Sequence, residues 1–219
     1  MFNFNYDQGA GNNRCGGYSL AAIATRLKPN ENHDPQTVYN NLRDSQVGLG
    51  PNSQNLVAGT QQGGTDILLP STFLAAQYAQ LNYELYLNRT TFVREAAPEL
   101  PNNIDADDII DEEIATINAQ GGHLNQLTVQ PDEIGPSLEK FLLDDYVNNQ
   151  HRYWLVLVLE GRHWIAIERD QNGGYCIYNP AGGINAVANI AGDVIMYTDN
   201  NNIAHTDNWS GIAISVINT

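Results

Sequence analysis

The sequence predicts an α+β protein in which helices come first and an antiparallel sheet comes last. Apolar residues recur at helical spacing in several segments up to about residue 146, whereas the chain from residue 153 onward contains short strand-like segments separated by turns. There is no internal repeat and no evident linker, so we expect one domain spanning residues 1–219.

The helical part begins with a periodic apolar segment over 16–27, which Lys28-Pro29-Asn30 brings to an end. Asp34 before Pro35 is typical of a helix start and predicts a second helix over 34–44. Residues 48–64 are rich in glycine, asparagine and glutamine, and this loop is long enough to form a mobile flap. The remaining patterns predict helices over 70–81, 105–119 and 132–146, with a strand over 83–87.

The last part of the chain predicts a meander of antiparallel strands. Three segments, 153–160, 163–169 and 175–178, are rich in β-branched and aromatic residues and are separated by glycine-containing turns. Residues 193–198 and 212–217 are further strand candidates. The sheet is therefore expected to lie at the C-terminal end of the sequence.

The chain carries 25 acidic and 10 basic residues, a formal net charge of −15. A nucleic-acid partner is not expected, because binding phosphates requires a basic face, whereas a protein or peptide partner, possibly a basic one, is compatible with this charge. The sequence contains no CxxC, no HExxH and no histidine pair at metal spacing, so we expect neither a metal nor another cofactor. The acidic run over 105–113 lacks the glycine and the spacing of a calcium loop, and we interpret it as a solvated helix face.

No apolar run is long enough for a membrane span, and the start MFNFNYDQ lacks the basic region and apolar core of a secretory signal. We therefore expect a protein that is cytoplasmic in the producing cell or secreted as a leaderless effector. The two cysteines, Cys15 and Cys176, fall in different contexts and are not expected to form a disulfide. Cys176 alternates within a strand pattern, which favours a core position.

Cys15 lies where a polar, glycine-rich segment meets the start of an apolar helix, in NRCGGYSLAAIA. The helix dipole favours a thiolate at such a position, so Cys15 is a candidate nucleophile. An inert core cysteine is the alternative. The polar lead-in and the Gly16-Gly17 pair, which do not indicate a packing position, favour catalysis.

A nucleophilic cysteine needs a base, and the base needs a group that holds its ring. His163 starts a predicted strand directly after a turn, and Asn179 ends the next strand, nearly symmetric with His163 about the turn near Asn172. Opposite ends of such a hairpin face each other, so we expect His163 and Asn179 to be neighbours. His205 and Asp207, in the polar, loop-like run NNNIAHTDNW, are an alternative pair.

With the order Cys15, His163 and Asn179, the sequence resembles the papain-like cysteine peptidase superfamily. His163 follows Cys15 by roughly 150 residues, close to the spacing of about 130–150 in papain-type enzymes, and Asn179 lies slightly beyond. The motifs Cys-Gly, His-Trp-Ile-Ala-Ile and Tyr-Asn-Pro-x-Gly-Gly are also similar to bacteriocin-leader peptidases, in which the third residue is more often aspartate. The resemblance covers roughly residues 8–27 and 153–183, and the CGSCW-type signature of papain is absent.

The resemblance implies a fold in which the catalytic cysteine begins a helix packed on the sheet, and a cysteine protease or other thiol hydrolase acting on an amide bond. It also implies a glutamine upstream of the cysteine that binds the oxyanion. Gln8 is the candidate at a spacing one residue longer than usual, and Asn12 and Asn13 compete with it. The same residue types deamidate glutamine or transfer an acyl group, so a bacterial effector deamidase or transglutaminase-like toxin is an alternative, and a catalytically dead papain-like binding module is another.

Overall fold

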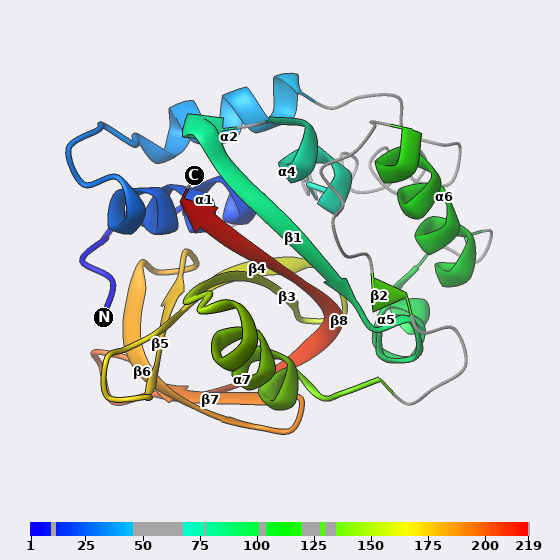
Figure 1. Cartoon of the computed structure of the whole chain (residues 1–219). Helices are drawn as coiled ribbons and strands as arrows, with labels where there is room; N and C mark the ends of the chain where they lie inside the picture. The colour runs from blue at the N-terminus through cyan, green and yellow to red at the C-terminus, as the bar shows by residue number, and fades with distance from the viewer. Residues whose placement is uncertain are drawn as a thin grey trace.

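The computed structural model agrees with the predicted α+β class: helices come first in the chain, and most of the sheet is formed by its C-terminal third (Figure 1). It describes residues 1–9, 12–45, 68–76, 78–100, 104–119, 128–129 and 135–218. The candidate flap over 48–64 lies outside these residues. The helices are α1 (Cys15–Leu27), α2 (Pro35–Asp44), α4 (Pro70–Ala76), α5 (Arg89–Ala96), α6 (Ala106–Ala119) and α7 (Leu138–Asn149), with 3₁₀ turns at Tyr78–Gln80 and Ala97–Glu99.

The strands form one sheet in the order β2-β1-β8-β3-β4-β5-β6-β7, and β8 also pairs with β7. Apart from the parallel pair β1 and β2, all neighbours are antiparallel. Because β8 pairs with β7 through its first half and with β3 and β1 through its second half, strands β3 to β8 close into a barrel. The strands are β1 (Leu81–Leu87), β2 (Thr128–Val129), β3 (Tyr153–Val158), β4 (His163–Arg169), β5 (Tyr175–Asn179), β6 (Ile184–Ala191), β7 (Val194–Thr198) and β8 (Ala204–Asn218).

The long strand β8 changes partners at Gly211, which adopts a φ of +84°. A Cβ atom at this position would lie 2.5 Å from the backbone nitrogen of Phe92 in α5. The carbonyl of Gly211 accepts a hydrogen bond from the backbone N–H of Asn88, which caps α5. Glycine is therefore required here both by the backbone angle and by the close approach of α5.

Alternation along the barrel strands produces two cores. Trp154 and Val156 on β3 belong to the core inside the barrel, which α7 covers with Leu138 and Leu142. The intervening Leu155 belongs to a second core between the sheet and the helices. Helix α1 packs between α2 and strands β3 to β5, so its first turn lies close to the barrel (Figure 1).

The N-terminal segment 1–9 runs across strands β5 and β6. Phe4 packs edge-on against Tyr178 of β5, with ring centroids 5.2 Å apart. The Tyr178 hydroxyl donates to the carbonyl of Tyr6 at 2.6 Å, and Asn185 Nδ2 of β6 donates to the carbonyl of Phe4 at 2.8 Å. These contacts fix the chain that leads into the first turn of α1.

Three predicted elements differ from the observed bounds by more than two residues. The helix expected over 70–81 ends at Ala76, because Ala79 and Gln80 have φ angles of 50° and 57° and cannot continue a helix. The helix expected over 132–146 begins at Leu138, where Ser137 caps it, and runs on to Asn149. The strand expected over 212–217 is the end of β8, which begins at Ala204 within a run that was expected to be a loop. Helix α5 and strands β2 and β6 were not predicted.

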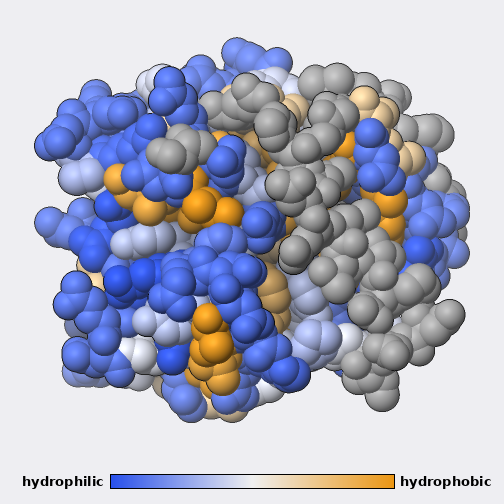
Figure 2. Space-filling model, in the orientation of Figure 1, coloured by the Kyte–Doolittle hydropathy of each residue, from blue (hydrophilic) through white to orange (hydrophobic). Residues whose placement is uncertain are grey.

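The face seen in Figure 2 is largely hydrophilic, with hydrophobic side chains confined to separate small areas. Within the described part of the chain, no helix has the length and apolar character that crossing a membrane requires.

Candidate active site

Cys15 is the first residue of α1, and its side chain lies at the N-terminal end of the helix. Arg14 occupies the N-cap position without a side-chain capping bond, and the first turn contains no acidic residue. The positive end of the helix dipole and the unpaired N–H groups of the first turn are therefore not neutralised by a carboxylate within the helix. This environment favours a negative charge on the sulfur of Cys15.

Gly16 and Gly17 are buried packing positions in this helix, contrary to the expectation of an open loop. A Cβ atom at Gly17 would lie 2.5 Å from Cβ and 2.6 Å from Cα of Tyr39 in α2. A Cβ atom at Gly16 would lie 2.9 Å from the ring of Phe73 in α4 and 3.5 Å from the ring of Trp164 in β4. The two glycines allow the helix start to approach its neighbours closely, and this approach positions the cysteine.

Helix α1 is also tied to the strand that carries the candidate base. Ser19, one turn after Cys15, is fully buried and donates a hydrogen bond to the carbonyl of Trp164 at 3.1 Å. The indole of Trp164 in turn donates to the carbonyl of Leu68 at 3.0 Å. Because Trp164 directly follows His163, these bonds hold the imidazole in a fixed place relative to the helix start.

The structure brings Cys15, His163 and Asn179 together. His163 begins β4 and Asn179 ends β5, and these strands pair antiparallel from Ala166 opposite Tyr178 onward. His163 Nε2 lies 2.9 Å from Asn179 Oδ1, and the imidazole forms a hydrogen bond with the side chain of Cys15. All three residues are at most 7% exposed.

The pKa values of Cys15 and His163 move in opposite directions. Burial by itself would raise the pKa of Cys15, but the hydrogen bond and charge of His163, with the N–H groups of Trp164 and Gly16, lower it below its ordinary value. Burial would likewise lower the pKa of His163, but Cys15 and Asn179 raise it above its ordinary value. Both shifts favour a thiolate beside an imidazolium.

Behind Asn179, a line of hydrogen bonds continues through strands β7 and β8. Asn179 Nδ2 donates to the hydroxyl of Tyr197 at 2.8 Å, and this hydroxyl donates to Asp207 Oδ2 at 3.0 Å. Asp207 is 7% exposed and Tyr197 is 5% exposed. Asp207, considered from the sequence as a replacement for Asn179, therefore lies behind it rather than in its place.

His205, the other member of the alternative pair, does not take part in the pair with Cys15. Its ring stacks on Tyr197 with centroids 4.9 Å apart, and its Nε2 lies 3.1 Å from Asp199 Oδ2. The sequence run that contains His205 and Asp207 is strand rather than loop, so these two residues, two positions apart, lie on the same face of β8. Tyr197 lies two residues after Ile195, on the same buried face of β7, which is a signal for an inward position. Its link to Asp207 depends on the β7–β8 hairpin.

Gln8 is held beside the site by its backbone. Its N–H donates to the carbonyl of Pro180, the residue after Asn179, at 3.0 Å, and its carbonyl accepts from Asn12 Nδ2 at 2.7 Å. Its side-chain Oε1 is buried and has no hydrogen-bond partner among the described residues. The side-chain amide of Asn12 is thus used in a hydrogen bond within this loop. The side-chain oxygen of Gln8 makes no such bond to a described residue. Asn13 lies in the same loop and is half-buried.

Both cysteines are free thiols, so no disulfide links them. Cys176 is 3% exposed within β5, in agreement with the core position predicted for it. The solvated face expected over 105–113 is corrected at Glu113, which is 6% exposed. Glu113 Oε2 accepts the backbone N–H of Ser71 at 3.1 Å, and burial raises the pKa of this carboxyl to about 7.

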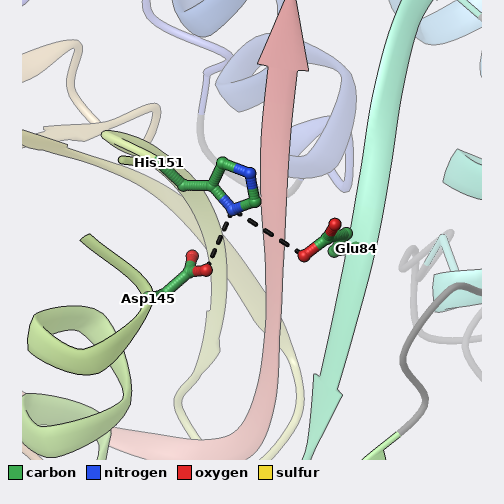
Figure 3. Close-up of side chains that lie close together, drawn as sticks. All are labelled: Glu84, Asp145 and His151. Atoms are coloured by element: carbon green, nitrogen blue, oxygen red, sulfur yellow. Dashed lines mark hydrogen bonds and ion pairs between the residues drawn. The ribbon is translucent and has the colours of Figure 1, made fainter. Parts of the chain in front are cut away.

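One cluster in the described part of the chain has the residue types of a metal site. Glu84, Asp145 and His151 point toward one another from β1, α7 and the segment before β3, with candidate ligand atoms within 4.8 Å of one another (Figure 3). His151 Nδ1 lies 2.9 Å from Asp145 Oδ1 and 3.8 Å from Glu84 Oε2.

The hydrogen bonds of Asp145 explain this cluster without an ion. Besides His151, its carboxylate accepts from Asn149 Nδ2, from the indole of Trp154 at 2.7 Å and from the hydroxyl of Ser215. Four donors use the capacity of the two oxygens, and they join α7 to β3 and β8. We therefore interpret Asp145 as a buried polar anchor of α7.

Searches of protein-family models, of curated proteins and of solved structures with this chain find no match.

Proposed function

We propose that this protein is a papain-like cysteine hydrolase that attacks an amide carbonyl of a protein or peptide substrate. The observation that supports the proposal is the arrangement of Cys15 at the start of α1, hydrogen-bonded to His163, whose ring nitrogen Nε2 lies 2.9 Å from Asn179 Oδ1. A nucleophile is bonded here to a base, and the base is bonded to a group that orients it, which is the arrangement that thiol hydrolysis requires. A helix that begins at the cysteine and packs on an antiparallel barrel also supports a papain-like fold.

In the proposed reaction, the Cys15 thiolate attacks the carbonyl carbon and forms a tetrahedral intermediate. The N–H groups at the start of α1 stabilise the oxyanion, with the side-chain amide of Gln8 as the second donor. The His163 imidazolium gives its proton to the leaving amine, and the C–N bond breaks to leave a thioester on Cys15. His163 then takes a proton from water as the water attacks the thioester, which releases the acid and restores the thiolate–imidazolium pair.

The proposal is tested by incubating the protein with a mixture of denatured proteins and synthetic peptides and measuring product masses. Chain cleavage, amide-to-acid conversion and crosslinking each change the mass differently, so one measurement distinguishes peptidase, deamidase and acyl-transfer activity. Cys15→Ala and His163→Ala should each abolish the product, and Asn179→Ala should lower the rate less, because Asn179 orients the base without accepting the proton. Activity that survives Cys15→Ala would contradict the proposal.

The reactivity of Cys15 provides a test that needs no substrate. Selective and rapid alkylation of Cys15 at mildly acidic pH supports a thiol hydrolase, whereas slow, unselective alkylation supports a binding module without catalysis.

A further inference from the structure

The direction of the hydrogen bonds behind Asn179 follows from which of the side chains can donate a hydrogen and which can only accept one. Asp207 as a carboxylate only accepts hydrogen bonds, so the Tyr197 hydroxyl, 3.0 Å away, is the donor. The lone pairs of the Tyr197 oxygen then accept from Asn179 Nδ2 at 2.8 Å. The amide of Asn179 is therefore held with its oxygen toward His163.

A second bond requires the same orientation of the amide. The backbone N–H of Ala181 donates to Asn179 Oδ1 at 2.9 Å, so this atom has to be an acceptor. With the oxygen of Asn179 facing Nε2 of His163, that ring nitrogen carries the hydrogen. The other ring nitrogen, Nδ1, is then left for Cys15, as the lone-pair base in the neutral ring and as the second N–H in the imidazolium.

We infer that Asp207 is a positioning residue of the candidate active site, acting on His163 through Tyr197 and Asn179. Its negative charge fixes the direction of the hydrogen bonds that lead from Asp207 through Tyr197 and Asn179 to His163. The same charge stabilises the imidazolium form of His163 opposite the Cys15 thiolate. The inference rests on the proposed function, because it assigns a role to Asp207 within the thiolate–imidazolium pair.

The groups around Asp207 support this role. Burial and the charge of Asp207 raise the pKa of Tyr197, so its hydroxyl keeps the proton that it donates. Burial raises the pKa of Asp207, while the hydrogen bond from Tyr197 and the positive charges of His163 and His205 oppose that shift. His205 lies on β8 beside Tyr197 and is paired with Asp199, so it influences Asp207 only by its charge.

The test measures the rate of Cys15 alkylation by iodoacetamide between pH 4 and 9, in the wild-type protein and in Asp207→Asn and Tyr197→Phe. Asp207→Asn preserves the shape of the side chain and removes its charge, whereas Tyr197→Phe preserves the ring that stacks on His205 and removes the link. In both variants we expect the midpoint for proton loss from the His163 imidazolium to fall by about 0.5–1 pH unit. This shift favours the neutral thiol–imidazole pair over the thiolate–imidazolium pair, and it lowers the alkylation rate at neutral pH by up to roughly three- to tenfold. ¹⁵N spectra of the His163 ring should show imidazolium being lost at lower pH than in the wild type.

Asp199→Asn is the matched control, because it makes the same chemical change next to His205 and outside the line to Asn179. Its alkylation profile should equal that of the wild type. Wild-type profiles for both Asp207→Asn and Tyr197→Phe, in folded proteins, would overturn the role of Asp207 while leaving the proposed function intact. If the wild-type protein itself has no acid limb at Cys15, the proposed function fails and this inference fails with it.

Discussion

The backbone N–H of Gln8 donates to the carbonyl of Pro180 at 3.0 Å, and Pro180 directly follows Asn179. One bond thus connects the loop before Cys15 to the end of the strand that carries Asn179. It places the backbone of Gln8 next to the residue that follows Asn179, although Gln8 is one residue further from Cys15 than the common spacing.

This position leads to a prediction for Gln8. Gln8→Ala should lower kcat roughly a hundredfold or more with little change in KM, because an oxyanion donor acts mainly in the transition state. Alkylation of Cys15 by iodoacetamide should be unchanged, since that reaction forms no oxyanion. Asn12→Ala and Asn13→Ala are the comparisons. If either of these loses activity while Gln8→Ala does not, that asparagine is the donor.

The opposite pKa shifts of Cys15 and His163 predict selective alkylation in acid. At pH 5.5, iodoacetamide should modify Cys15 about tenfold faster or more than Cys176, as measured by peptide mass spectrometry. The lowered pKa of Cys15 lets the thiolate form at a lower pH, and the raised pKa of His163 keeps the imidazolium to a higher pH. Activity should therefore rise through the first pKa and fall through the second.

Two histidine variants control this experiment. His163→Ala should lower the alkylation rate of Cys15 at pH 5.5 to that of a buried thiol, whereas His205→Ala should have little effect. The reverse result would make His205 the base and contradict the assignment of His163.

The close contact at Gly17 predicts a large difference between two neighbouring glycines. Gly17→Ala should destabilise the protein by about 1–3 kcal/mol, because the new methyl group would meet the backbone of Tyr39, which cannot move away. Gly16→Ala should cost less, since the nearest atom there is the far end of the Phe73 ring. Urea unfolding midpoints measure both. Equal midpoints for the two variants would refute the close packing of α1 on α2.

The hydrogen bonds of Asp145 predict that this residue is essential for stability. Asp145→Asn should lower the free energy of unfolding by about 1–3 kcal/mol for each buried donor left unpaired, with Trp154 and Ser215 as the affected donors. Asp144→Asn, next in sequence but half-exposed and paired with Lys140, should change it by about 0.5 kcal/mol or less. If zinc added to the wild-type protein raises its Tm but not that of Glu84→Gln, the cluster binds metal and our interpretation is wrong.

Burial of Glu113 predicts a decrease in stability with rising pH. Its pKa is about 7 in the folded protein and about 4.5 in the unfolded chain, so the folded state binds more protons between these two pH values. The free energy of unfolding should fall by about 3 kcal/mol across this window and lose nothing further from this group above it. Glu113→Gln should remove this decrease, while Asp108→Asn, exposed on the same helix, should retain it. A decrease that persists in Glu113→Gln would assign it to another group.

The parts of the site that lie within one hairpin were predictable from the sequence, because local pattern and turn spacing determine them. Strand 163–169 has the bounds expected, and the pairing of His163 with Asn179 follows from the symmetry of the two strands about their turn. The helix start at Cys15 follows from apolar spacing in the same way.

What the sequence did not predict depends on contacts made across the barrel. Residues 204–208 are polar and resemble a loop, but they form a strand because β7 supplies their backbone partners. The position of Asp207 behind Asn179 arises only when that pairing closes the barrel. Glu113, by contrast, lies at helical spacing between Ile109 and Ile117, so the periodicity of α6 places it on the buried face. The contact that accommodates its carboxyl there, the N–H of Ser71 in α4, depends on packing between the two helices.

The double role of β8 has a consequence for the order of events during synthesis. Cys15 leaves the ribosome early, whereas Asp207 and the second half of β8, which pairs with β3 and β1, leave much later. Until those residues emerge, the barrel stays open and its most distant pairings in sequence are missing. A growing chain would thus carry Cys15, His163 and Asn179 without the strand that supplies Asp207, and the proposed activity would begin only when residues 204–218 have left the ribosome.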